Sequence, residues 1–512
     1  MKKLKNAYLK APALFSLLLC IAVVIGSFAV YLGIGLLPGR VRMFDITENK
    51  LYTLHDETVR FISSVGRDVE ILLVSESGIP EYGAPEVLLR SYAETNRRIK
   101  LSVVSPEEMF AKYGTLTEGC AVIRSDARET VVYSSDYFDV SDEYFDISYE
   151  YYYYLTQQGY DFGTYADFMY SGYAEQLGLF DIVRYQSTLT NAIRYVVSDN
   201  VTTLYSVTDH KEMTLDVYLY PELRRSNTEL IFGKLSEGIP EQADGVLINN
   251  PQVDITEADK AALAEYLSGG GRITLITSYN YIKELPLLLS VCEEYGLTTD
   301  GRLLCEDEEE YHYGSYVEAT HPTVNGDAFG GYLTADGLKP LAMGGTGITI
   351  TEKEGITSVS LLDTSDNAYG KLEKDEDEKE SGDATASDAA DQVVRKRYSV
   401  AAMAKRASDG SSLLWFPTFA FSDSMYDTFA ERDNFPVFVA AIGVQYGYDK
   451  PIDIPAVSIS TAPLDVPDAA FPVGMVIAII IPCAIIAVGG VTVMKRKNSA
   501  YATADQSATE EE

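Results

Sequence analysis

The sequence predicts an α/β fold carried between two membrane-spanning helices. A long apolar stretch without a charged residue lies near each end of the 512-residue chain. Between these stretches, short apolar runs of strand length alternate with helical patterns. Alternation of this kind predicts a parallel sheet with helices on both faces. The roughly 430 intervening residues exceed one usual domain, so two or three domains are expected.

The first predicted span covers residues 11–37 and follows a cytoplasmic N-terminus, residues 1–10, that contains four lysines. At about 1.5 Å per residue, this run is long enough to cross a hydrocarbon core of about 30 Å. The alternative is a cleaved signal peptide, with Ser27 and Ala29 as the small residues before the cut. Because the apolar run continues to Leu37, the sequence favours an uncleaved anchor.

The second predicted span covers residues 472–494 and stops at Lys495-Arg496-Lys497, the start of a cytoplasmic tail at 495–512. Lysine and arginine beside a span are retained in the cytoplasm. Arg40 and Arg42 are a weaker signal of the opposite sense. The prediction is a two-pass protein of the cell membrane, in contact with lipid, with both termini cytoplasmic and the central part extracytoplasmic.

Composition limits the chemistry of that central part. A formal net charge of −35 excludes nucleic acid as a partner, since phosphate binding needs a cationic surface. Three cysteines lie outside the spans and form no CxxC motif, so no disulfide framework is expected, although a Cys292–Cys305 bridge stays open. The histidines are too scattered to predict a metal site; they are His55, His210, His312 and His321.

Residues 38–132 predict a first α/β domain. A helix capped by Thr53 or Asp56 runs through Ile62, and then a strand, a helix and a second strand follow at 68–75, 84–97 and 99–105. This is a βαβ unit. Residues 119–133 predict a hairpin that turns at Asp126-Ala127.

Residues 133–187 form a connecting region in which tyrosines, including Tyr151 to Tyr154, are interleaved with aspartates. Such rings can stack on sugars, but amphipathic aromatic side chains also serve in partly buried packing and at partner interfaces. Packing or a partner interface is the favoured interpretation.

Residues 188–450 predict a second domain with a parallel sheet. Predicted helices cover 188–196, 222–235 and 256–267, and predicted strands start at 201, 244 and 272. A further strand is expected within 411–424 and a helix near 435–444. Residues 371–393 are too charged to fold and predict a disordered acidic loop, and residues 451–471 are a linker to the second span.

Several segments, in order, resemble the extracytoplasmic auxiliary subunits of ABC transporters of the gliding-motility type. They cover most of residues 41–446. The matching segments are DITENKLYTLHDET at 45–58, VEILLV at 69–74 followed by LLRSYAETNRRIKLSVVSPE at 88–107, LTNAIRYV at 189–196, LYSVTDHKE at 204–212, ADGVLINNPQVDITEADKAALAEYLSGGGRITLIT at 243–277, and SDSMYDTFAERDNFPVFVAAIGV late in the chain.

The resemblance implies a protein that works beside an ABC ATPase and a polytopic permease without catalysing a reaction itself. It also implies a thioredoxin-like first domain and a flavodoxin-like or amidotransferase-like second domain. The family typically has a Thr-Gly-His-Gly-Glu-like loop where this chain has Thr208, Asp209, His210, Lys211 and Glu212. Asp209 and Lys211 replace the glycines, and Trp415-Phe416-Pro417 replaces a more polar strand end.

No catalytic residue and no cofactor is expected. The first domain has no cysteine after its first strand, so thiol exchange is not expected. After the strand that starts at Arg272, only Ser278 is available as a nucleophile. The best candidate for a ligand site is the loop with Thr208, Asp209, His210 and Glu212, because open α/β sheets bind ligands at the carboxyl ends of strands. The simpler interpretation is that His210 braces the loop.

Three functions therefore compete. The favoured one is a non-enzymatic auxiliary subunit of an ABC transport system, whose outer domain contacts the permease, the substrate or the envelope. The second is an amidotransferase-like hydrolase that uses His210 and Glu212. The third is a membrane-tethered protein that binds the cell envelope through its tyrosine-rich segment.

Overall fold

The computed structural model describes the central part of the chain, namely residues 45, 49–75, 84–371, 395–431, 433–447, 450–459 and 495. The two predicted spans, 11–37 and 472–494, and the predicted acidic loop after Lys371 lie outside the described residues. Among the described residues, no helix has the length and apolar character needed to cross a bilayer. The chain divides into one unit up to Ile459 and another from Ser460, and only the first is described in detail below.

The first sheet confirms the predicted βαβ unit and hairpin. Strand β1 (Val69–Val74) runs parallel to β2 (Ile99–Val104), with helix α4 (Ala84–Thr95) between them in sequence. Helix α5 (Pro106–Tyr113) leads to the antiparallel pair β3 (Ala121–Arg124) and β4 (Glu129–Val132). The sheet order is β2-β1-β3-β4.

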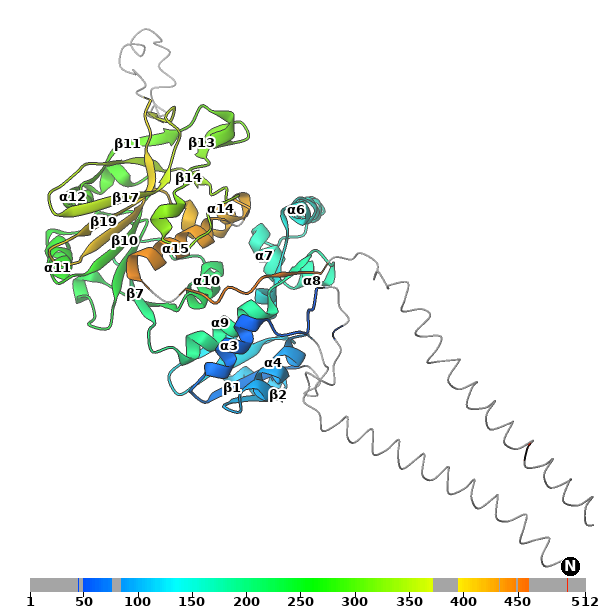
Figure 1. The fold of residues 1–512 in the computed structure, drawn as a ribbon. Coiled ribbons are helices and arrows are strands. Elements are labelled where there is room, and N and C mark those ends of the chain that lie inside the picture. Colours follow the sequence, from blue (N-terminus) through cyan, green and yellow to red (C-terminus); the bar gives the residue numbers. More distant parts are fainter. Residues whose placement is uncertain are drawn as a thin grey trace, which may run out of the picture. The chain divides into compact units, whose positions relative to one another are not determined.

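Two further helices complete the core of this sheet (Figure 1). Helix α3 (Asp56–Ser64) is capped by the His55 side chain, which accepts a hydrogen bond from Glu57 N, rather than by Thr53 or Asp56 as predicted. Helix α9 (Tyr185–Val197) comes from a later part of the chain and buries Leu189 and Ile193 in the same cluster as Ile62. The Tyr92 hydroxyl lies 2.8 Å from Thr190 Oγ1 and fixes α9 against α4.

The tyrosine-rich region forms a small helical insertion between β4 and α9. Its elements are η1 (Ser134–Tyr137), β5 (Phe138–Asp139), α6 (Asp142–Gln157), α7 (Tyr165–Tyr170), α8 (Tyr173–Gln176) and β6 (Ile182–Val183). Most of its rings pack together around buried Phe168, Tyr165 and Leu155. Their aromatic faces and edges thus build a separate small core.

The second sheet contains five parallel strands in the order β8-β7-β9-β10-β20. They are β7 (Thr202–Val207), β8 (Thr228–Gly233), β9 (Gly245–Asn249), β10 (Arg272–Ile276) and β20 (Ser412–Phe416). The predicted parallel sheet is therefore present. The predicted helix at 222–235 is wrong: α10 (Tyr220–Arg225) ends early, Asn227 takes a left-handed φ of 55°, and the chain continues as edge strand β8.

An antiparallel extension that the sequence did not predict continues this sheet beyond β20. Strand β19 (Ser399–Arg406) pairs with β20, and β16 (Thr346–Ile350), β17 (Ile356–Asp363) and β11 (Leu297–Cys305) follow outward. The remaining short strands are β12 (His312–Tyr313), β13 (Tyr316–Thr320), β14 (Thr323–Val324), β15 (Ala342–Met343) and β18 (Tyr369–Lys371).

Helices cover both faces of the parallel part, as predicted (Figure 1). On one face lie α11 (Glu257–Ser268) and α12 (Pro286–Glu294); on the other lie α10, α14 (Ser424–Phe429) and α15 (Asn434–Tyr446). Neighbouring strand residues point to opposite faces, so Leu275 packs in the cluster with α11 and α12, and Ile276 packs in the cluster with α15. Single-turn segments are η2 (Val217–Leu219), η3 (Leu235–Glu237), η4 (Ile282–Glu284), η5 (Glu309–Tyr311), η6 (Gly326–Phe329) and η7 (Phe419–Ser422).

The chain after α15 returns to the insertion. Strand β21 (Val457–Ser458) pairs antiparallel with β6, which pairs with β5. Asn49 Nδ2 donates a hydrogen bond to the Ser458 carbonyl oxygen at 2.6 Å. The two ends of the described chain therefore meet.

Candidate functional site

The loop that carries the candidate site leaves the carboxyl end of β7, in the middle of the parallel sheet. The neighbours of β7 are β8 on one side and β9 on the other, so the strand order reverses here. Open α/β sheets bind ligands at such reversal points. The loop thus occupies the position that the sequence analysis proposed for a ligand site.

The first two residues of the loop bond to the segment that follows β8. Thr208 Oγ1 donates to the Gly233 carbonyl oxygen at 3.0 Å. The Asp209 carboxylate accepts hydrogen bonds from Leu235 N, Ser236 N and Ser236 Oγ at 2.9–3.2 Å. Both side chains therefore have structural partners.

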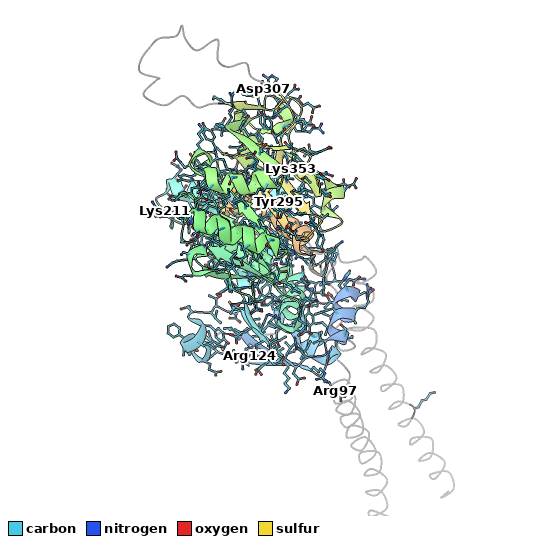
Figure 2. All side chains as sticks on the ribbon, turned by 90° about the vertical axis from the view of Figure 1, so that its left-hand side faces the viewer. Arg97, Arg124, Lys211, Tyr295, Asp307 and Lys353 are labelled. Atoms are coloured by element: carbon cyan, nitrogen blue, oxygen red, sulfur yellow. The ribbon has the colours of Figure 1, made fainter. Side chains whose placement is uncertain are left out.

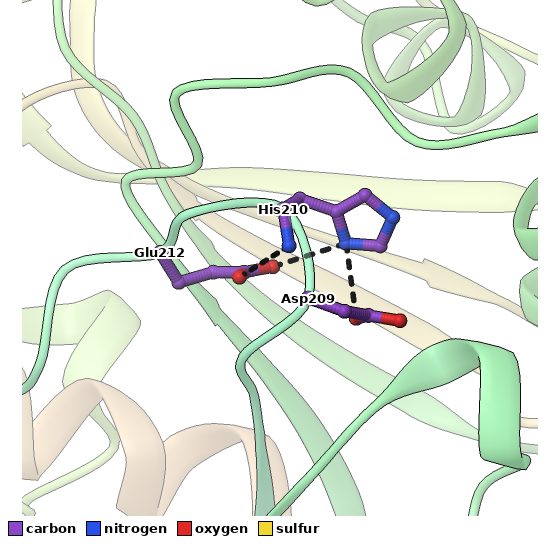
Figure 3. Close-up of side chains that lie close together, drawn as sticks. All are labelled: Asp209, His210 and Glu212. Carbon is purple, nitrogen blue, oxygen red and sulfur yellow. Dashed lines mark hydrogen bonds and ion pairs between the residues drawn. The ribbon is translucent and has the colours of Figure 1, made fainter.

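His210 lies at the centre of the loop, and its side chain is only 6% exposed. Its Nδ1 lies 3.2 Å from Glu212 Oε1 and 3.2 Å from Asp209 Oδ1 (Figure 3). Its Nε2 lies 3.1 Å from Asp259 Oδ2. Because both ring nitrogens face carboxylate oxygens, both are donors, and the ring is an imidazolium.

Asp259 is the partner that the sequence analysis missed. It is the third residue of α11, where it accepts hydrogen bonds from the N-cap residue Thr256 while Thr256 Oγ1 accepts from Asp259 N. The Thr-x-x-Asp spacing of this capping box was visible in the sequence. Its contact with a histidine 49 residues earlier in the chain was not.

The backbone of the loop is tied to the end of β9. The His210 carbonyl oxygen accepts from Gln252 N and Val253 N, both at 3.1 Å, and Asn249 Nδ2 donates to the Met213 carbonyl oxygen at 2.8 Å. Lys211 takes a left-handed φ of 57° and its side chain points outward (Figure 2). Glycine adopts this conformation without strain, which explains why glycine suits this position in the resembled motif.

The electrostatics of the loop stabilise the charged ring. The Glu212 carboxylate raises the pKa of His210 to about 9, burial opposes this rise, and Asp259 adds to it. Burial acts to raise the pKa of Asp259, but hydrogen bonds from Thr256 and His210 outweigh it and lower that pKa. An imidazolium already bonded to carboxylates is a poor acceptor for a substrate proton. The arrangement fits a brace better than a general base.

Among the described residues, Asp209, His210 and Glu212 form the one group whose side chains are close enough together to hold a metal ion. Potential ligand atoms of Asp209, His210 and Glu212 lie within 4.8 Å of one another. A metal needs an unprotonated histidine nitrogen. Because the pKa of His210 is raised to about 9, a metal ion would have to displace a proton from Nδ1, which lies 3.2 Å from an oxygen of each of the two carboxylates.

The residues considered for covalent chemistry are buried. Ser278, after β10, is 1% exposed, and its Oγ has no hydrogen-bond partner among the described residues. Cys120, Cys292 and Cys305 are buried and form no disulfide, so the Cys292–Cys305 bridge that the sequence left open is not present. Burial raises the pKa of Cys292, which disfavours a thiolate.

Comparisons with known proteins identify no family. No protein-family model matches the chain, and no curated protein matches it. Among solved structures, one match is to the mmIFT52 N-terminal domain, with 16% sequence identity and a TM-score of 0.36. The match spans 48% of this chain and 97% of the mmIFT52 chain. A ThuA-like protein from Bacteroides uniformis is 12% identical over 48% of this chain and 91% of its own, with a TM-score of 0.28.

A beta-galactosidase from Rahnella sp. R3 is also 12% identical, with a TM-score of 0.27, and the match spans 51% of this chain but only 34% of the enzyme. At such scores, none of these similarities supports an activity, a substrate or a partner for this chain.

Proposed function

We propose that this chain is a non-enzymatic, membrane-anchored auxiliary subunit of an ABC transport system, with residues 38–471 displayed outside the cell membrane. The observation that carries the proposal is the hydrogen bond from Asn49 to Ser458. The segments that continue toward the two predicted spans leave the described fold at one place. A domain tethered at one place by two helices is suited to stand on a membrane complex.

The sheet topologies support the fold that the resemblance implies. The order β2-β1-β3-β4, with a parallel first pair and an antiparallel second pair, is compatible with the thioredoxin-like domain that the resemblance implies. The order β8-β7-β9-β10-β20 corresponds to 2-1-3-4-5 along the chain, the flavodoxin-like order. The gliding-motility-type auxiliary subunits are expected to combine these two domains.

The state of His210 supports a role without catalysis. Three carboxylates surround a buried imidazolium, so the loop gains rigidity and loses the free base that an amidotransferase-like hydrolase needs. Within the part of the chain that the structure describes, Ser278 Oγ has no hydrogen-bond partner that could activate it. The hydrolase is therefore the weaker hypothesis. We expect the His210→Gln variant, at normal expression, to retain transport activity. Loss of a hydrolytic activity in that variant would instead support the hydrolase hypothesis.

Envelope binding has one observation in its favour. Five tyrosines of the insertion are exposed: Tyr133 at 45%, Tyr151 at 37%, Tyr153 at 58%, Tyr154 at 56% and Tyr160 at 52%. Exposed rings of this kind stack on sugars or anchor a protein partner. Pull-down on purified cell-wall polymer distinguishes a sugar ligand from a protein partner. If the envelope is the ligand, the native chain binds the polymer, and replacement of these tyrosines by serine abolishes that binding.

Display outside the membrane is tested by labelling intact cells with a membrane-impermeant maleimide. Lys211→Cys and Lys353→Cys place a thiol at exposed positions of the second domain (Figure 2). The natural cysteines Cys120, Cys292 and Cys305 are buried and give a low background. Labelling of both variants in intact cells is expected, and labelling only after cell lysis contradicts the proposed topology.

A further inference from the structure

A cavity of about 470 Å³ lies where the tyrosine-rich insertion, the helical face of the second domain and the chain after α15 come together. Its wall includes side chains of β5, α7, α10, α14 and α15 and the segment 450–453. This volume is in the range of small-molecule sites. The cavity does not include the His210 loop, so it is a separate feature of the fold.

The charges on the cavity wall do not balance. Of the three cations, Arg184 pairs with Asp139, and Arg225 pairs with Glu222 at 3.0 Å. The third, Lys450, lies over the Tyr332 ring, 5.1 Å from its centroid. Three further carboxylic acids line the wall, namely Asp136, Asp427 and Asp453.

Asp136 and Asp427 have no cation within ion-pair distance in the part of the chain that the structure describes. Tyr133 N donates to Asp136 Oδ2 at 2.8 Å, and Phe435 N donates to Asp427 Oδ1 at 2.9 Å. Asp427 is 9% exposed, and burial raises its pKa to about 8. Burial likewise raises the pKa of Asp136 to about 6, although Arg225 and Arg224 lower it from beyond ion-pair distance. Two carboxyl groups therefore face the cavity without an ion pair in the described part of the chain.

Aromatic rings form much of the remaining wall. Tyr170 and Tyr218 stack at 4.5 Å between centroids, and Tyr165, Tyr332 and Phe138 also line the space. The faces of such rings attract cations and also pack against apolar groups. Carboxylic acids outnumber cations on this wall by five to three, and both arginines are already paired with carboxylates, so Lys450 is the one wall cation outside those two ion pairs.

We propose that this cavity binds a small organic cation, an ammonium or guanidinium group on an apolar body, with the charge at Asp427 and Asp136 and the body against the tyrosine rings. The ligand supplies the counter-charge that the wall lacks. This inference does not depend on the transporter assignment.

The cavity is connected to the membrane-directed end of the described chain. Asn191 of α9 and Ile452 form two reciprocal hydrogen bonds: Ile452 N donates to Asn191 Oδ1 at 2.8 Å, and Asn191 Nδ2 donates to the Ile452 carbonyl oxygen at 3.1 Å. The segment that closes the cavity continues directly into β21. A ligand that contacts this segment thus stabilises the part of the chain that leads toward the second predicted span.

The test is calorimetric titration of the intact protein in mild detergent with three benzyl compounds that differ in charge. Benzylguanidinium is cationic, benzylurea is neutral and phenylacetate is anionic. Benzylguanidinium is expected to bind at least about tenfold more tightly than either other probe, since one such ion pair is worth about a factor of ten. Equal binding of the three probes, or no saturable binding of benzylguanidinium, overturns the proposal.

Asp427→Asn keeps an acceptor for Phe435 N and removes the carboxyl group that ionises when a cation binds beside it, so it is expected to weaken benzylguanidinium binding about tenfold. Asp423→Asn is the matched control, because Asp423 caps the same helix and does not line the cavity. Unchanged affinity in Asp427→Asn, with the thermal midpoint preserved, contradicts the proposal. Asp136→Asn provides a second test with the same expected direction, in a different element.

Discussion

Asn49 and Ser458 are 409 positions apart in the chain, yet Asn49 Nδ2 donates a hydrogen bond to the Ser458 carbonyl oxygen at 2.6 Å. The contact is supported by β21, which pairs with β6, and by Ile459 N, which donates to the Asp181 carbonyl oxygen. The tyrosine-rich insertion therefore serves as the common platform for both ends of the described chain.

This contact predicts a specific cross-link. In the Asn49→Cys, Ser458→Cys double variant, an intrachain disulfide is expected to form under mild oxidation, because the side chain at position 49 reaches the backbone of residue 458. Non-reducing gel electrophoresis after proteolysis between the two positions measures it. The matched control combines Asn49→Cys with Lys353→Cys and is expected to stay uncross-linked. Equal cross-linking in both variants contradicts the contact.

The charged state of His210 predicts a loss of stability at alkaline pH. Its pKa is raised from 6.5 to about 9 in the fold, so its contribution is complete below pH 6.5 and is lost as pH rises through about 9. The contribution is on the order of 2 kcal/mol. The difference in unfolding free energy between the native chain and His210→Gln is expected to shrink between pH 6 and pH 9.5. A constant difference across this range contradicts an imidazolium.

Asp259 is predicted to stabilise both the α11 cap and His210. Asp259→Asn removes the negative charge beside a buried imidazolium and is expected to cost about 2 kcal/mol. That corresponds to a fall of several degrees in the thermal midpoint, at roughly 3 °C for each kcal/mol. Glu257→Gln, an exposed carboxylate in the first turn of the same helix, is the control and is expected to change the midpoint little. Equal effects of the two variants would refute a special role for Asp259.

Asn191 is predicted to hold the segment 450–459 in place. Asn191→Ala removes both hydrogen bonds to Ile452, and each such bond is worth about 1 kcal/mol. Hydrogen exchange of the Ile452 amide and of β21 is expected to accelerate, while exchange in β9 and β10 is unchanged. Asn200→Ala, at an exposed loop position, is the control. Unaltered exchange of Ile452 would show that another contact fixes this segment.

Much of the fold was predictable because local patterns and tertiary structure agree. The βαβ unit ending at Val104, the hairpin at 119–133 and the helix predicted at 256–267 follow from periodicity and turn residues. The prediction of helix for residues 228–233 was wrong because a short apolar run fits both the helical repeat and the strand repeat. Asn227 ends α10 with a left-handed backbone conformation, which composition does not reveal.

Contacts between distant segments were not predictable from one sequence. The antiparallel extension depends on pairing β11 with β16 and β17 with β19 across long loops. The role of His210 depends on Asp259, which is adjacent only after β7, β9 and α11 have assembled. The cavity likewise collects Asp136, Arg225 and Asp427 from separate elements. Sequence analysis found the loop at the end of β7 but not the environment that decides its chemistry.

Partnership with a transporter can be measured as the set of proteins that copurify with this chain. The intact chain is purified by affinity from native membranes in mild detergent, and the recovered proteins are quantified by mass spectrometry. The control bait is a chain in which residues 38–471 are replaced by an unrelated soluble domain between the same spans. Stoichiometric recovery of an ABC ATPase and a polytopic permease with the intact chain, and not with the control, is the predicted result. Recovery of the intact chain alone, under conditions that preserve other membrane complexes, contradicts the account.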